Sequence, residues 1–520
     1  MLFNSYIFAA FFALFLVLYW LFRQNRWAQT ALILVGSYIF YGWWDERFLI
    51  LIITSTITDY VVMLGMVDRR LTLRQGFYFS AYLLLSSFLL MLPHWKETSW
   101  CLWFVVAYVA AGWIIYPRLF GLSEAGRKKV LLISILCVDL GVLAVFKYFN
   151  FFVDSFAGAA AALGWNVDPV TLNIVLPVGI SFYTFQTIGF CIDVYRGKSR
   201  PPTDFMQFSA YVAFFPQLVA GPIERGGHLL PQFAKPHSPS LNGSWLFLWG
   251  LYKKIVIADN LAPIVQAVFS DPTAASSGQL IAVVLAFAFQ IYCDFSGYSD
   301  MARGIARMMG FDILLNFNLP YVARTPSEFW GRWHISLSTW LRDYLYVPLG
   351  GNRRGRFLTY RNLMLTMLLG GLWHGAAWTF VLWGAFHGAI LCAYRMLGVD
   401  EWLGRRQGSS ALRSAQDMLL IGLMFLLTCI GWLFFRARDM HTLAAFFRGM
   451  DGAVSIEPFG SVFFYVTPLL VFQALQIWKK KLEPLADLPR FARMNIQLFI
   501  LFGLLFLSSS KPQEFIYFAF

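Results

Sequence analysis

The sequence predicts an all-α polytopic integral membrane protein. The chain of 520 residues is 58% hydrophobic and only 13% charged, and its mean hydropathy is +0.60. Soluble domains lie closer to half apolar and a quarter charged, so this balance excludes an ordinary soluble enzyme, a disordered chain and a secreted disulfide scaffold. Aromatic residues make up 18% of the chain, which suits a body in lipid with aromatic belts at its interfaces.

Apolar runs fill nearly the whole sequence. A crossing needs roughly 20 apolar residues, because only a helix satisfies its own backbone in lipid. We expect about 11–13 transmembrane helices, with the remaining runs re-entrant or interfacial. The candidate spans are residues 3–22, 28–44, 48–66, 77–93, 100–116, 130–149, 171–192, 206–222, 243–269, 278–295, 362–382, 380–398, 414–435, 461–477 and 493–509.

Charge in the loops predicts the orientation. Arginine and lysine are in excess after the first, third and fifth spans, and the second and fourth loops carry no such excess. Basic loops face the cytoplasm, so we expect the N-terminus on the opposite, outer side of the membrane. The first 22 residues lack the basic start and the small-residue cleavage site of a signal peptide, and we expect them to remain as the first span.

The overall charge bears on the partners. Lys and Arg number 41 against 28 Asp and Glu, a net charge of +13. In a soluble protein this would suggest nucleic acid, but here the basic residues lie in short loops, which favours topology signals and contact with the lipid bilayer. The six cysteines form no C-x-x-C pair, so neither a metal site nor a redox pair is predicted.

Residues 296–361 interrupt the apolar pattern. Nine arginines alternate there with tryptophans and tyrosines, too polar to span the membrane and too apolar for a free loop. Amphipathic helices in the cytoplasmic interface fit this composition. The stretch is either a platform for an anionic donor, such as a nucleotide-bearing thioester, or a surface for lipid headgroups.

Two histidines are candidates for chemistry. His374 lies in an almost uncharged run with glycines around it, and an ionisable side chain within a span indicates a functional site unless it is simply bonded across helices. His334 lies in EFWGRWHISLSTWLRDYLYVPLGGNR; if this stretch is helical, Ser338, Leu341 and Arg342 share its face. Arg342 could then hold phosphate while His334 faces the reacting carbonyl, or His334 is an interfacial histidine.

Acidic residues form a second set of candidates. Asp294 and Asp300 lie in QIYCDFSGYSDMARG, and an acid near the membrane pairs with a base, orients a histidine or relays a proton. For Asp300, Arg303 or Arg307 is the simplest partner. His387 falls on a different face of a helix from His374, so the two do not form a metal pair. No G-x-S-x-G elbow is present, and we predict no serine nucleophile.

Six ordered motifs resemble the membrane-bound O-acyltransferase family, and within it the bacterial polysaccharide branch that includes the membrane subunit of alginate O-acetylation. The C-terminal EFIYFAF (514–520) is similar to that branch as well, whereas residues 70–117 match it less clearly. The motifs are LPVGISFYTFQTIGFCIDVYRG (176–197), FFPQLVAGPIER (214–225), QIYCDFSGYSDMARG (290–304), FNLPY (317–321), the His334 block (328–353) and LLGGLWHGAAWTFVLWGAFHG (368–388).

The resemblance implies a single acyltransferase domain over residues 1–520. Residues 1–129 supply the less family-like N-terminal spans, 130–398 the motif-bearing core and 399–520 the C-terminal spans. It also implies a central funnel open to the cytoplasm, with acetyl-CoA as the expected acyl donor and no bound cofactor. The acetyl group would pass to a periplasmic or membrane-anchored SGNH-type partner that acetylates an exopolysaccharide such as alginate.

The family's two histidines fall on His334 and His374. A neutral histidine takes a hydroxyl proton near neutral pH, and we expect His374 to be the base and His334 the donor-side or second catalytic group, with the reverse assignment open. Further candidates for binding the donor or supporting the histidines are Trp333, Ser336, Arg342, Asp343, Tyr344, Trp373 and Asp294.

Other functions remain open on the sequence alone. A polytopic transporter or flippase has buried acids and interrupted spans, but it would show two homologous halves. A non-catalytic membrane scaffold would tolerate loss of His374. Within the enzyme class, the alternatives are acetylation of cellulose, peptidoglycan or another envelope polymer, and D-alanyl transfer to a teichoic acid.

Overall fold

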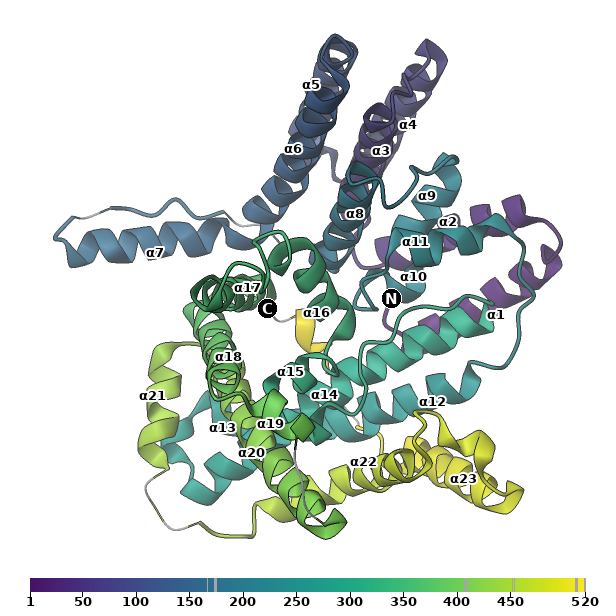
Figure 1. Ribbon diagram of the computed structural model, residues 1–520. Helices are drawn as coiled ribbons and strands as arrows, with labels where there is room; N and C mark the ends of the chain where they lie inside the picture. Colours follow the sequence, from purple (N-terminus) through teal and green to yellow (C-terminus); the bar gives the residue numbers. More distant parts are fainter. Residues whose placement is uncertain are drawn as a thin grey trace. The chain divides into compact units, whose positions relative to one another are not determined.

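The computed structural model describes residues 1–165, 167–172, 175–405, 409–450, 452, 454–509 and 513–518. Within them the regular elements are helices and no strand occurs, so the predicted all-α class is confirmed (Figure 1). Residues 173 and 174 of the predicted span 171–192, and residues 519 and 520 of the C-terminal motif, lie outside the described residues. The chain forms two compact units, residues 1–242 with 305–313 and residues 243–304 with 314–520.

The first unit contains the helices from α1 to α11. Polar caps begin several of them: the Ser5 and Asn25 side chains accept from the first turns of α1 and α2, and Thr72 and Gln75 form a capping box at α4, which satisfies backbone N–H groups that a helix start leaves open. The helices are α1 (Tyr6–Leu21), α2 (Arg26–Gly42), η1 (Glu46–Phe48), α3 (Leu49–Met66), α4 (Leu73–Met91), η2 (Leu92–His94), α5 (Trp95–Leu119), α6 (Glu124–Leu143), η3 (Ala144–Tyr148), α7 (Phe149–Ala162), α8 (Ile180–Tyr195), α9 (Phe205–Val212), α10 (Phe215–Leu218), α11 (Gly226–Leu229) and η4 (Leu230–Ala234).

The second unit contains most of α14 and the helices around it. Of the apolar windows long enough to cross a membrane, that of α14 is the most enclosed in the described residues, at 83% buried, so α14 is the central helix of this unit. The helices are α12 (Ser244–Tyr252), η5 (Lys253–Ala258), α13 (Asp259–Ser270), η6 (Pro272–Ala274), α14 (Ser277–Met308), η7 (Pro320–Val322), α15 (Pro326–Trp330), α16 (Ile335–Leu341), η8 (Arg342–Tyr346), α17 (Arg356–His374), α18 (Trp378–Met396), α19 (Val399–Arg405), α20 (Ser410–Arg436), α21 (Met440–Gly449), α22 (Phe459–Lys479), η9 (Pro484–Asp487), α23 (Arg490–Phe506) and η10 (Ile516–Phe518).

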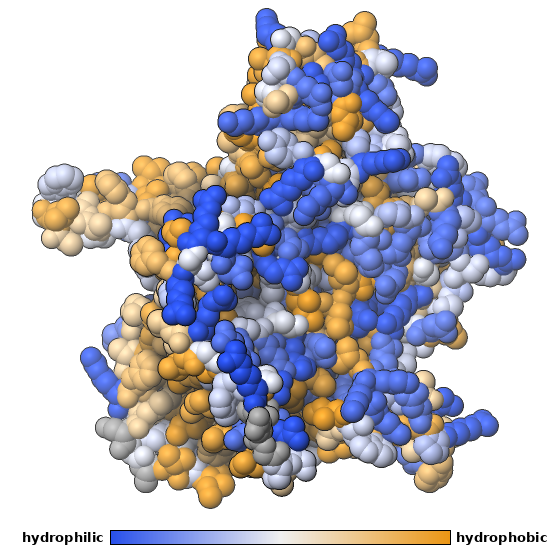
Figure 2. Space-filling view, viewed as in Figure 1, coloured by the Kyte–Doolittle hydropathy of each residue, from blue (hydrophilic) through white to orange (hydrophobic). Residues whose placement is uncertain are grey.

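Seven helical segments in the described residues are long and apolar enough to cross a membrane, or eight if the bent pair α18 and α19 is one span. This is fewer than the 11–13 crossings predicted. The difference arises because apolar runs break: 206–222 forms the short α9 and α10, and 243–269 is divided by the π-helical η5. The α5 window is only 6% buried, and apolar side chains face outward on α7 (Figure 2), as a multi-pass membrane protein requires.

The polar stretch 296–361 is not a set of interfacial helices from its start. Residues 296–308 continue α14, and the short helices α15 and α16 come only after an extended segment. The prediction placed the end of the span near residue 295, because Asp300 and Arg303 lower the hydropathy. Asp300 is neutralised by Lys253 at 2.8 Å, so the helix carries these charges without interruption.

Small residues join α17 to α18. A Cβ built on Gly371 would lie 2.2 Å from the Phe380 carbonyl oxygen, and one on Gly384 would lie 2.4 Å from that of Met367. The two backbones therefore touch, as glycine permits in helix pairs within membranes. The expected single spans 362–382 and 380–398 are instead a helical hairpin in which α17 ends at His374 and α18 begins at Trp378.

We expect Gly371→Ala and Gly384→Ala each to destabilise the protein by about 1–3 kcal/mol, because the added methyl group meets backbone that cannot move aside. The measurement is the thermal midpoint of the detergent-purified protein. Gly422→Ala in α20 is the control, since its Cβ meets nothing within 4 Å. A Gly371→Ala midpoint equal to that of the control would contradict this packing.

Candidate functional site

His334 occupies a special backbone position. It is the residue before α16 and has a left-handed conformation, with φ 43° and ψ 53°. Its side chain is fully buried, and its ring lies 4.7 Å from that of Phe295 on α14. Burial lowers the pKa of His334 to about 3, so the imidazole is neutral at physiological pH and can take part in hydrogen bonds without charge.

His374 is the last residue of α17 and not the middle of a span. It is 4% exposed, and its ring lies 5.0 Å from both Trp373 and Trp383 and 5.3 Å from Phe435. The chain turns sharply at the next residue, Gly375. A Cβ there would lie 2.1 Å from the Phe380 ring, so a larger side chain does not fit. Glycine at that position therefore allows the turn that brings His374 against α18 and α20.

The two histidines come together in the second unit. Their ring centroids are 6.5 Å apart, although they lie 40 positions apart in the sequence. Tyr517, from the C-terminal segment, lies beside both: its ring is 5.7 Å from that of His374 and 6.4 Å from that of His334. We call His334, His374 and the aromatic residues around them the histidine site.

Buried charges hold the C-terminal tail (residues 513–518) at this site. The Ile516 N–H donates to an Asp294 carboxylate oxygen at 2.7 Å, and the Lys254 Nζ donates to the Gln513 carbonyl at 3.0 Å. Lys254 also pairs with Asp294 at 2.6 Å and with Asp259 at 2.8 Å. The predicted supporting residue Asp294 thus fixes the tail that lines the site.

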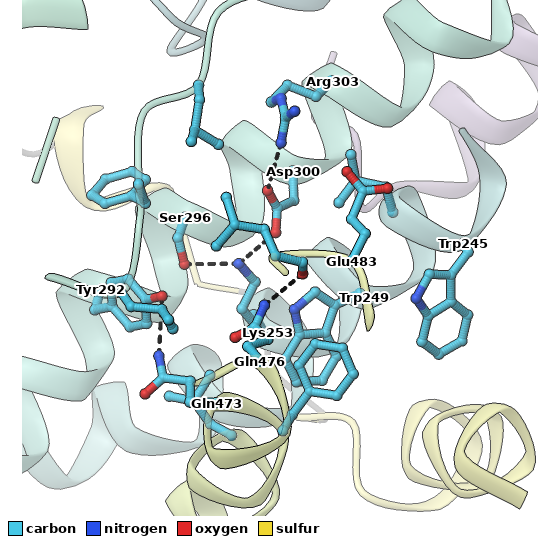
Figure 3. A pocket seen from close by; sticks show the side chains of 17 residues that line it. Trp245, Trp249, Lys253, Tyr292, Ser296, Asp300, Arg303, Gln473, Gln476 and Glu483 are labelled. Atoms are coloured by element: carbon cyan, nitrogen blue, oxygen red, sulfur yellow. Dashed lines mark hydrogen bonds and ion pairs between the residues drawn. The ribbon is translucent and has the colours of Figure 1, made fainter. Parts of the chain in front are cut away.

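A second polar cluster lies on α14 two turns further along. Lys253 donates to Ser296 at 2.9 Å and pairs with Asp300 at 2.8 Å, as Figure 3 shows at a cavity of about 40 Å³. Arg303, which the sequence proposed as the partner of Asp300, is 3.9 Å away, so Lys253 is the closer partner. The cavity is large enough for water.

Three predicted supporting residues lie near the histidines. Trp373 adjoins both rings, at 6.0 Å from His334 and 5.0 Å from His374. Trp333 packs behind His334, with its ring 5.0 Å from Phe317 and 4.7 Å from Trp432. Ser336 donates to the Asn316 side chain at 2.6 Å, which fixes the first turn of α16.

Arg342, Asp343 and Tyr344 lie in η8, the π-helical segment that follows α16. Arg342 is 61% exposed at its side chain and pairs with Asp343 at 2.8 Å, while the Tyr344 ring packs 5.0 Å from that of Trp340. The shared face expected for His334 and Arg342 required a helix through His334, but α16 begins at Ile335 and His334 precedes it in a left-handed conformation. These residues belong instead to a partly exposed polar surface.

His387 lies beside the histidine site, because its ring and that of His374 both contact Trp383. His387 is fully buried among aromatic rings, 4.8 Å from Trp383 and 5.2 Å from Trp330. His94 pairs with Glu46 at 3.0 Å. In the part of the chain that the structure describes, no group of three or more His, Cys, Asp or Glu side chains is arranged to hold a metal ion.

Sequence reasoning missed Tyr517, Phe295, Lys253 and Lys254. Phe295 and Tyr517 lie within segments that carry the family resemblance, residues 290–304 and 514–520. That membership was a signal that could have identified both residues. The lysines gave none, because Lys253 and Lys254 lie in an apolar run and their acidic partners on α14 are about 40 or more positions away.

Comparison with known proteins identifies the family of the chain. A model of the membrane-bound O-acyltransferase family matches residues 198–399, which include both histidines. The chain is 39% identical over 457 residues to the probable alginate O-acetylase AlgI of Pseudomonas putida, covering 86% of this chain and 80% of that protein. The AlgI of Azotobacter vinelandii is 40% identical, with 86% and 78% covered.

A peptidoglycan O-acetyltransferase of Helicobacter pylori is 35% identical over 382 residues, covering 67% of this chain and 69% of that protein. These similarities extend well beyond the motifs and run through both compact units. The chain is therefore a multi-pass membrane O-acyltransferase, and it belongs to the membrane-bound O-acyltransferase family.

Proposed function

We propose that this protein takes an acetyl group from cytoplasmic acetyl-CoA and passes it across the inner membrane for O-acetylation of an exopolysaccharide such as alginate. A periplasmic SGNH-type acetyltransferase is the proposed partner, and the chain acts as one acyltransferase domain with its N-terminus in the periplasm. The observation that carries the proposal is the buried pair His334 and His374, in a chain about 39% identical to probable alginate O-acetylases.

The proposed chemistry is direct acyl transfer. His374 takes the proton of the acceptor hydroxyl, whose oxygen attacks the thioester carbonyl. The new C–O bond forms, the C–S bond breaks, and the thiolate leaves with a proton as the free thiol. His334, neutral because of its burial, polarises or orients the carbonyl from the donor side, and removal of such a group typically costs ~3–4 kcal/mol of barrier.

The surroundings of the histidines support this assignment. Trp373, Trp383, Phe435 and Tyr517 surround His374 with ring contacts of 5.0–5.7 Å. An aromatic enclosure keeps water from a thioester that would otherwise hydrolyse, and electrostatic interactions are stronger where water is absent.

The donor phosphates need a separate cationic surface. Arg353, Arg354 and Arg356 are exposed in the segment that leads into α17, the helix that ends at His374. Arginine offers a planar fork for phosphate oxygens. We propose this segment, together with Arg342, as the docking surface for the nucleotide end of the donor.

Peptidoglycan is the second candidate acceptor. The relative from Helicobacter pylori named as a peptidoglycan O-acetyltransferase is 35% identical, close to the 39% of an alginate relative. Both acceptors offer sugar hydroxyl groups, so the histidine chemistry is the same and the polymer must be identified by experiment.

Ester-linked acetate on secreted and envelope polysaccharides of the host tests the proposed function. Deletion of the gene and His374→Ala should each abolish acetate on one polymer, because the base is lost in both. The measurement is acetate released by mild alkali from each purified polymer, with blots showing equal protein in the membrane.

The polymer that loses acetate distinguishes the proposed acceptors, and the His374→Ala strain distinguishes an enzyme from a scaffold. Loss of acetate from alginate or another secreted polymer supports the proposal, and loss from peptidoglycan selects the second candidate. Normal acetate in the His374→Ala strain, with acetate absent in the deletion strain, would contradict the catalytic assignment of His374 and favour a scaffold.

The second prediction concerns the tail. Lys254→Met removes the charge between Asp259 and Asp294, and breaking a buried ion pair typically costs ~3–5 kcal/mol. We expect the tail to leave the histidine site and transfer activity to fall about 100-fold, as small displacements of positioned groups do. Lys480→Met, at an exposed lysine, should keep full activity.

The position of the tail has its own readout. A cysteine in place of Ile516 should react slowly with a maleimide in the parent protein and quickly when Lys254→Met is added. Slow labelling in both, with activity lost, would show that Lys254 acts on something other than the tail.

A further inference from the structure

The first unit contains a large apolar cavity. Its volume is about 370 Å³, and it is enclosed by α3, α4, α5 and α6. Residues from all four helices line it, among them Val62, Phe79, Trp113 and Leu131. Ligand sites in proteins typically have volumes of ~300–1,000 Å³ and mostly apolar walls.

The polar groups in its walls already have partners. The hydroxyls of Thr58 and Tyr108 share a hydrogen bond of 2.5 Å, and the Trp113 Nε1 donates to Ser80 at 2.9 Å. The Tyr116 hydroxyl donates to the Arg69 carbonyl and the Ser134 hydroxyl to that of Val130. A buried water needs two to four polar partners, so these walls favour hydrocarbon over water.

The cavity is open on the side of α5, where the helix is exposed on the outer surface of the unit. The apolar window of α5, which forms a wall, is only 6% buried, and α5 packs mainly on α4. A Cβ on Gly112 of α5, which lines the cavity, would meet nothing within 4 Å. In a membrane protein this side faces lipid, so an acyl chain can enter sideways between the helices.

The loop end of the cavity is strongly basic. Residues 67–75 and 117–129 contain seven Lys or Arg against two acids, a local net charge of 7 − 2 = +5. Both acids are engaged: Asp68 pairs with Arg127 at 3.0 Å and Glu124 with Lys128 at 2.5 Å. Arg70 and Arg74 are exposed there, and the end of this helix group is hydrophilic in Figure 2.

We propose that this groove binds an anionic phospholipid, with one acyl chain in the cavity between α3, α4, α5 and α6 and the phosphate among the arginines of the loop end. Basic pockets between transmembrane helices on the cytoplasmic side bind anionic headgroups. A dry apolar cavity next to a surplus of positive charge matches both halves of such a lipid. The site lies in a different compact unit from the histidines and is independent of the acyl-transfer proposal.

The test measures lipid binding directly. The full chain is purified, stripped of lipid and mixed with phosphatidylglycerol or phosphatidylcholine of identical acyl chains, and bound lipid is counted by native mass spectrometry. We expect one tightly bound phosphatidylglycerol, with phosphatidylcholine binding on the order of tenfold more weakly. Equal binding of the two lipids would overturn the proposal.

Two variants fill the cavity from different helices. Gly112→Leu in α5 and Ser134→Leu in α6 each place a side chain in the space meant for the acyl chain. Each should abolish the tight phosphatidylglycerol site. The matched control is Gly141→Leu in α6, which also has open space around its Cβ but does not line the cavity. The assigned location would be contradicted if the control lost lipid binding, or if both filling variants kept it.

A charge pair tests the headgroup end. Arg70→Gln with Arg74→Gln should weaken phosphatidylglycerol binding on the order of tenfold and leave phosphatidylcholine binding unchanged, because each basic residue near the surface contributes favourably to anionic lipid. Lys479→Gln with Lys480→Gln removes the same charge from the second unit and should have no effect. An equal loss in both double variants would indicate unspecific attraction and overturn the proposal.

Discussion

The second unit depends on one helix crossing that buries charge. Lys253 and Lys254, both under 5% exposed, meet Asp300 and Asp294 of α14 at 2.8 and 2.6 Å. An unpaired charge in such surroundings costs several kcal/mol, so the pairs fix how η5 lies along α14. Glycines allow the approach: a Cβ on Gly250 would lie 2.5 Å from the Gly297 carbonyl oxygen.

The same turn of α14 organises the chemistry. Asp294 fixes the tail through the Ile516 N–H, and the next residue, Phe295, packs on both His334 and Tyr517 at 4.7 and 4.6 Å. The residue that fixes the tail and the residue that contacts His334 are therefore neighbours in the sequence, Asp294 and Phe295, but they differ in role. Lys253 and Lys254 offset the buried carboxylates. The His334 imidazole, which its burial keeps neutral, lies instead among aromatic rings, where electrostatic interactions are stronger because water is absent.

The sequence predicted the parts of this account that local pattern determines. Long apolar runs predicted helices in a membrane, and motif resemblance identified His334 and His374 as the candidate residues for chemistry. Local pattern could not predict that α17 ends at His374, because Gly375 follows within an apolar run and its turn depends on contact with Phe380. Nor could it predict the lysine partners of Asp294 and Asp300, since those pairs depend on a contact between distant segments. Hydropathy therefore ended α14 too early and counted broken helices as spans.

The central claim is that His334 and His374 together perform acyl transfer. The most direct measurement uses the purified protein in vesicles, with a thioester donor radiolabelled in its acetyl group, and follows label moving to a hydroxyl acceptor. The account predicts that His374→Gln and His334→Gln each abolish transfer, while His387→Gln, at an equally buried histidine outside the pair, retains it. Transfer that survives in His374→Gln and His334→Gln alike would contradict the account.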